Sequence, residues 1–141
     1  MIEFYSETNF ELSNEAAINH WITTVIEKEN CSLGDVTYIF CYDEYLYEMN
    51  VEYLNHDTYT DIISFDYRVG NQINGEIYIS VDRVKENAAE YGVSFENELL
   101  RVIIHGILHF LGHKDKSDKE AQKMRLLEEE ALKLFDKQNL G

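Results

Sequence analysis

The feature that most restricts the fold is an apolar helix in the second half of the chain that carries two histidines. Seven of the ten residues 102–111 have large apolar side chains, so a helix formed by them is buried on most of its surface. His105 and His109 interrupt this run four positions apart. That spacing puts them on one helix face with Cβ atoms about 5–6 Å apart. Because an unpartnered imidazole is costly in apolar surroundings, the pattern favours a shared metal ion over a chance pair of histidines.

The residues that follow this helix supply a third metal ligand. Gly112 can adopt the left-handed conformation that ends a helix, so the chain reverses and brings Asp115 back toward the two imidazoles. We prefer Asp115 as this ligand; His113 stays open as the alternative, because imidazole is the stronger donor for zinc. Three protein ligands leave one position on Zn²⁺ open, which is typical of a catalytic site. His105, His109 and Asp115 are therefore the predicted metal ligands and catalytic residues.

Length and composition predict one folded domain spanning residues 1–141. Hydrophobic residues make up 45% of the chain and aromatic residues 13%, which excludes a disordered protein. No apolar run approaches the roughly 18 residues of a membrane span, and the first residues lack the pattern of a signal peptide. We therefore expect a cytoplasmic protein with no membrane partner, in which Cys31 and Cys41 are free thiols.

Charge is distributed unevenly along the chain. The net charge of −15 argues against polyanionic partners, and DNA is not expected. Residues 1–67, however, hold 14 acidic and one basic side chain, whereas basic residues gather around the histidine motif. A phosphate-bearing substrate could be steered to that end, although a solvated helix face explains Lys119, Lys123 and Arg125 equally well. The candidate substrate-binding residues are Arg101, Lys114, Arg83 and Arg68.

Apolar periodicity and helix-capping residues predict four strands and five helices. Ser13 or Asn14, Ser94, and Ser117 with Glu120 are the predicted helix caps. The third and fourth strands form an antiparallel hairpin, and 55–58, with His56, is a loop. The fold class is α+β (α/β-like): a single domain with a mixed sheet of about four strands covered by about five helices. The strands are expected at 2–5, 36–41, 61–66 and 75–80, and the helices at 14–26, 43–53, 82–91, 94–111 and 117–137.

Three segments resemble the YbeY endoribonucleases, which are bacterial rRNA maturation factors. Thr60-Asp61-Ile62-Ile63-Ser64-Phe65 is similar to the family's Thr-Asp/Asn-Val-Leu-Ser-Phe strand, and Gly75-Glu76-Ile77 to its Gly-Asp-Ile strand. The helix from His105 to Gly112 is similar to its His-Gly-x-x-His-Leu-x-Gly motif. The resemblance implies a metal-dependent single-strand endoribonuclease that acts in small-subunit rRNA maturation and ribosome quality control. The implied partners are ribosomal RNA and the small ribosomal subunit. The implied cofactor is one Zn²⁺ or another divalent transition metal.

The chain departs from the family pattern at two positions. Asp115 stands where the family has its third histidine, which exchanges a neutral donor for an anionic one. Leu54 follows Tyr53 where the family usually has an arginine. A contact attributed to that arginine cannot be transferred, so Arg68, Arg83 or Arg101 would have to replace it.

Two other functions remain open. A zinc metallopeptidase is the first, because the histidine spacing is similar to that of metzincins; Gly106 nevertheless occupies the position of the glutamate base in His-Glu-x-x-His. A non-catalytic ribosome-assembly module that binds RNA and holds a structural metal is the second. Thr60, Asp61 and Ser64 either orient a metal ligand or have a structural role at a strand edge.

Overall fold

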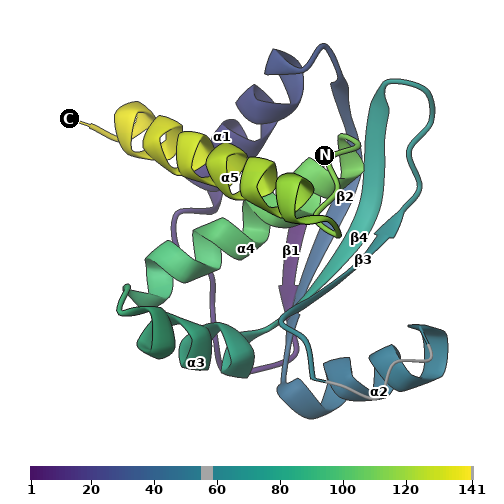
Figure 1. Ribbon diagram of the computed structural model, residues 1–141, viewed down its shortest axis with the longest axis vertical. Coiled ribbons are helices and arrows are strands. Elements are labelled where there is room, and N and C mark those ends of the chain that lie inside the picture. The colour runs from purple at the N-terminus through teal and green to yellow at the C-terminus, as the bar shows by residue number, and fades with distance from the viewer. Residues whose placement is uncertain (55–58, 141) are drawn as a thin grey trace.

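The computed structural model describes residues 1–54 and 59–140, so the loop predicted at 55–58, including His56, lies outside the described residues. Within these ranges the chain forms four strands and five helices (Figure 1), as predicted. The elements, in order, are β1 Ile2–Ser6, α1 Glu15–Lys28, β2 Ser32–Cys41, α2 Asp43–Leu54, β3 Ile62–Asp66, β4 Gln72–Ser80, α3 Val81–Tyr91, α4 Phe95–Phe110 and α5 Asp118–Gln138.

The strands form one mixed sheet in the order β1-β2-β4-β3. β1 and β4 run parallel to β2 on either side of it, whereas β3 pairs antiparallel with β4. The predicted hairpin and mixed sheet are both confirmed. Because β3 begins beside the end of β4, the backbone carbonyl of Asp61 accepts a hydrogen bond from the Ser80 N–H at 2.9 Å.

Helices cover both faces of the sheet. Ile77 and Ile79 of β4 face the main core, which α1, α4 and α5 complete. Side chains alternate along a strand, so Tyr78 faces the other side, where α2 packs with a smaller apolar cluster. Figure 1 shows α2 apart from the other helices, across the sheet. No helix among the described residues is both long enough and apolar enough to cross a bilayer.

Helix α4 is the most deeply packed element, as its sequence predicts. Ten of its 16 residues are buried. The hydroxyl of Tyr38, at the centre of the sheet, donates to the Ile103 carbonyl of α4 at 2.9 Å. Elsewhere in the main core, α1 is joined to α5 by the Trp21 indole N–H, which donates to the Ala131 carbonyl at 2.7 Å. The histidine-bearing helix is therefore fixed against the sheet.

The ends of α4 and α5 follow the predicted capping chemistry. Ser94 accepts a hydrogen bond from the Asn97 N–H at 3.0 Å, and Ser117 and Glu120 form the capping box. The prediction for α1 is only partly right. Asn14 is the N-cap residue, but its backbone is left-handed (φ 60°) and its side chain makes no capping hydrogen bond. Asparagine suits this position because it tolerates that backbone conformation. Cys31 and Cys41 are free thiols, as expected.

Gly75 lies where the hairpin packs against the end of α4. A Cβ at this position would lie 2.5 Å from the Phe110 ring and 2.6 Å from the Phe65 carbonyl oxygen. The ring can shift, but the backbone oxygen is held in the sheet. We expect Gly75→Ala to lower the free energy of unfolding by about 1–3 kcal/mol. Urea denaturation measures this as a lower midpoint with an unchanged slope. An unchanged midpoint would show that the hairpin backbone shifts to accommodate the added methyl group.

Candidate metal centre

The side chains of His105, His109 and Asp115 meet at the end of α4. The two Nε2 atoms lie 3.0 Å apart. The Oδ2 atom of Asp115 is 3.4 Å from the Nε2 atom of His105 and 3.3 Å from that of His109. Gly112 turns the chain with a φ of 100°, as predicted, and this turn returns Asp115 to the helix face. One atom from each residue can therefore bind the same ion, since all three lie within 4.8 Å of one another.

The outer nitrogen of each imidazole contacts a hydrogen-bond acceptor. The Nδ1 atom of His109 lies 2.9 Å from the His113 carbonyl oxygen, and that of His105 lies 2.7 Å from Glu128 Oε2. A carbonyl or carboxylate oxygen only accepts, so both Nδ1 atoms carry hydrogen. In the neutral imidazoles both Nε2 lone pairs then point toward the Asp115 carboxylate. Three acceptors converge with no donor between them, which is an arrangement that a bound cation stabilises.

The pKa of His105 reflects the same contacts. Burial acts to lower this pKa, but the hydrogen bond and charge of Glu128, together with the charges of Asp115 and Asp61, outweigh burial and raise it above the usual value. A proton on Nε2 and a metal ion would occupy the same lone pair. The acidic groups that favour the proton favour a divalent cation for the same electrostatic reason.

His113, the alternative third ligand, points elsewhere. Its Nε2 atom lies 2.9 and 3.0 Å from the two carboxylate oxygens of Glu29, next to the end of α1. Its backbone carbonyl, in contrast, holds His109. The geometry thus brings Asp115 rather than His113 to the two imidazoles.

A cavity of about 270 Å³ opens beside this centre. Its wall includes the acidic residues Asp61, Glu98, Asp115 and Glu128, with Arg101 and Arg125 as the basic ones. Burial is the largest cause that raises the pKa of Asp61, partly opposed by the charge of His105. Burial likewise raises the pKa of Glu98. The cavity therefore joins the proposed metal position to a predominantly acidic wall.

Comparison with known proteins identifies the family. The family model described as "Endoribonuclease YbeY" matches residues 2–136. The chain belongs to the Endoribonuclease YbeY family. The resemblance that the sequence motifs indicate is thereby confirmed over nearly the whole chain.

Individual relatives agree with the family model. A protein of Flavobacterium johnsoniae named Endoribonuclease YbeY is 57% identical over 135 residues, which cover 96% of this chain and 97% of the relative. A protein of Porphyromonas gingivalis with the same name is 45% identical over 132 residues, which cover 93% of this chain and 87% of the relative. The solution structure of a Thermotoga maritima protein matches with a TM-score of 0.65 at 27% identity, covering 99% of this chain and 94% of that one. The predicted α+β fold is confirmed.

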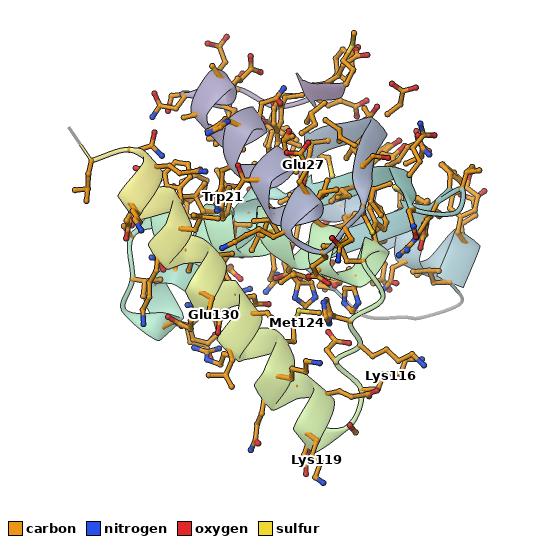
Figure 2. All side chains as sticks on the ribbon, turned by 90° about the horizontal axis from the view of Figure 1, so that it is seen from above. Trp21, Glu27, Lys116, Lys119, Met124 and Glu130 are labelled. Atoms are coloured by element: carbon orange, nitrogen blue, oxygen red, sulfur yellow. The ribbon has the colours of Figure 1, made fainter. Side chains whose placement is uncertain are left out.

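Two of the four basic residues predicted to bind substrate lie near the centre. Arg101 lines the cavity, but its guanidinium is bound by Glu128 at 3.1 Å and by Glu129 at 2.6 Å. Lys114 is exposed on the turn that carries Asp115, and the described residues offer it no ion-pair partner. Lys116 and Lys119 extend from the body at the start of α5 (Figure 2). Arg125, which is exposed and lines the cavity, likewise has no ion pair among the described residues. Free positive charge therefore lies both on this turn and at the cavity wall.

Arg83 and Arg68 are bound elsewhere in the fold. The guanidinium of Arg83 pairs with Asp43 at 2.6 Å and with Glu86 at 2.7 Å. Arg68 donates to the Phe110 carbonyl at 3.0 Å and so holds the end of α4. Neither lines the cavity beside the metal centre. Three arginines are candidates to replace the family arginine that is absent at Leu54. Of these, only Arg101 lines the cavity.

Sequence reasoning missed Glu128, which is 23 positions from His105 and on a different helix. One signal could have found it. The apolar face of α5 includes Met124, Ala131, Leu132 and Phe135, and Glu128 lies among them with only 6% of its surface exposed. A carboxylate in an apolar stripe needs a buried partner. The partners are His105 and Arg101.

Proposed function

We propose that this protein is a metal-dependent endoribonuclease that acts in rRNA maturation. Membership of the Endoribonuclease YbeY family supports the RNA-cleaving activity. The observation that carries the metal dependence is the convergence of three acceptor atoms, two imidazole Nε2 and one carboxylate oxygen, with both Nδ1 atoms already engaged. We take residues 1–141 as one catalytic domain. Its proposed partners are ribosomal RNA and the small ribosomal subunit, and it also acts in ribosome quality control. Its proposed compartment is the cytoplasm.

We propose Zn²⁺ as the ion, held by His105, His109 and Asp115. Two nitrogens and one oxygen suit zinc, while nickel, copper or iron also fit such a donor set. When bound, the ion lowers the pKa of water toward neutrality and polarises a phosphoryl oxygen. The anionic Asp115 reduces the positive charge of the site more than a histidine would.

The chain's own residues account for the rest of the proposed mechanism. Glu128 and the His113 carbonyl fix both imidazoles with Nε2 toward the substrate side. The exposed Lys114 lies next to the ligand Asp115, where it can contact the phosphate chain of a single strand. Arg101, which is bound by two carboxylates, supports Glu128 instead of contacting phosphate.

Packing around Gly106 argues against peptide hydrolysis. A Cβ at this position would lie 2.8 Å from Ile77 Cδ1 and 3.2 Å from Ile62 Cδ1. A glutamate base at this position, as in the His-Glu-x-x-His peptidases, would point into the packed sheet. No described contact favours the non-catalytic assembly module over the enzyme.

Removal of the metal tests the proposed function. Protein treated with a chelator and then dialysed is expected to lose cleavage of structured and single-stranded RNA, and stoichiometric Zn²⁺ is expected to restore it. Casein serves as the matched peptidase substrate and is expected to remain intact. Elemental analysis of untagged protein identifies the ion. RNA binding without cleavage at any metal loading would support the assembly module instead.

The choice between Asp115 and His113 has its own test. Asp115→Ala removes a ligand atom, so we expect the zinc affinity to fall by about tenfold or more. His113→Ala keeps the backbone carbonyl that holds His109, and we expect a much smaller loss. Competition with a zinc-binding dye measures both variants. A larger loss in the His113 variant would assign the third ligand to histidine.

A further inference from the structure

Two carboxylates in the cavity are not used by the metal centre. Asp115 and Glu128 contact the imidazoles, whereas Asp61 and Glu98 line the same wall without touching them. Glu98 has only 4% of its surface exposed. Within 1–54 and 59–140, neither side chain has an ion pair or a hydrogen bond to another residue. These two groups therefore remain as hydrogen-bond acceptors facing an open space.

The acceptors restrict what can enter the cavity. Burial raises the pKa of both carboxyl groups, because the nearby positive charges and, for Asp61, its own backbone N–H only partly compensate the lost hydration. The wall holds four carboxylates and two guanidiniums, those of Arg101 and Arg125, and Arg101 is already bound by Glu128 and Glu129. A phosphate would therefore meet a net negative wall, and like charges repel at this range. A neutral group that carries N–H donors would instead supply the missing hydrogen bonds. In an RNA strand whose phosphate lies at the metal, the neighbouring group of that kind is a nucleobase.

The remaining walls suit a flat ring. Ile62 and Val102 contribute apolar surface, and Tyr91, which is 59% exposed, contributes an aromatic ring. Single-stranded RNA is generally recognised in this way, with the face of an unstacked base on apolar or aromatic side chains and its edge hydrogen-bonded to polar groups. The cavity of about 270 Å³ opens directly onto His105 and Asp115.

We propose that this cavity is a nucleobase subsite beside the scissile phosphate, in which Glu98 and Asp61 select a base with an exocyclic amino group, above all guanine. Guanine presents N1–H and the 2-amino group side by side, so it can donate twice to one carboxylate. Uracil has no amino group and would leave an acceptor without a donor. The inference rests on the proposed endoribonuclease activity and deepens it by naming a base preference.

The test is the base composition around the cut sites in a random-sequence single-stranded RNA. Guanine is expected about tenfold or more above uracil at one position flanking the cut, which is the selectivity of a hydrogen bond to a charged group. Glu98→Leu has a similar volume and no acceptor, and it is expected to remove the preference while cleavage persists. Glu96→Leu, on an exposed position of the same helix, is the matched control and is expected to keep the preference. Circular dichroism verifies the fold of both variants.

A second measurement separates this inference from the proposed function. Equal base frequencies at the cut sites would reject the subsite and leave the nuclease intact, whereas a metal-loaded protein that cuts no RNA would count against the nuclease. In that second case, titration with guanosine and with inosine, which lacks only the 2-amino group, still decides the subsite. Guanosine is expected to shift the backbone amide NMR signals of Asp61 and Glu98 at about tenfold lower concentration. Equal responses to the two nucleosides would overturn the proposal.

Discussion

The His109→Ala variant is expected to bind zinc at least about a hundredfold more weakly than the native protein and to cleave RNA about a thousandfold more slowly. The substitution removes one of three converging acceptor atoms and leaves His105 and Asp115, whose Nε2 and Oδ2 atoms are 3.4 Å apart, as an incomplete ligand set. His109 lies at the edge of the core, with 30% of its side chain exposed, so the truncation leaves little buried void. Zinc competition and cleavage of a fluorescent RNA measure the two effects.

The control for this variant is His20→Ala, which removes an exposed histidine from α1. It is expected to keep both the zinc affinity and the RNA cleavage of the native protein. Urea denaturation of the metal-free proteins verifies that both variants fold. If the His109 variant bound zinc as tightly as the native protein, the metal centre would have to lie elsewhere.

Glu128→Gln is expected to lower the zinc affinity by about tenfold to a hundredfold, although Glu128 touches no metal ion. Glutamine keeps the size of the side chain but loses the charge that holds the Nδ1–H of His105 at 2.7 Å. Glu129→Gln is a matched control, because Glu129 shares Arg101 with Glu128 but does not contact the imidazole. We expect a loss of less than about threefold in that variant. Equal losses in the two variants would show that the net charge matters and the hydrogen bond does not.

The same substitution has a consequence for pH in the metal-free protein. Glu128 is the main group that raises the pKa of His105, so Glu128→Gln should lower that pKa. In the native protein, the stability contributed by the charged imidazole is fully present below the unfolded pKa of about 6.5 and disappears as pH rises through the folded value. The variant should lose this contribution. NMR titration of the His105 ring and urea denaturation at several pH values measure it.

The predictable part of the molecule depends on contacts that are close in sequence. Helix α4, the shared face of His105 and His109, and the turn at Gly112 all follow from side chains within one or two helical turns. The capping box of α5 is equally local. These features predict the proposed ligand set without any knowledge of the sheet.

The unpredicted part depends on which segments pack together. Glu128 reaches His105 only because α5 crosses α4, and no pattern near the histidines indicates that crossing. Arg101 illustrates the same limit. Its position one turn before His105 suggested a phosphate contact, whereas the crossing gives it two carboxylate partners. The backbone conformation of Asn14 was also beyond a prediction that considered only its side chain.

The turn that carries Asp115 is tied to two distant parts of the chain. His113 binds Glu29 next to the end of α1, and Arg68 of the β3–β4 hairpin holds the last carbonyl of α4. We therefore expect Asp115 to reach the imidazoles only when both regions have docked, so that binding of the proposed ion would depend on the completed tertiary structure. Bound zinc should raise the melting temperature in proportion to the logarithm of its free concentration. A cell short of zinc would then contain less of this protein, and the protein that remained would be less active.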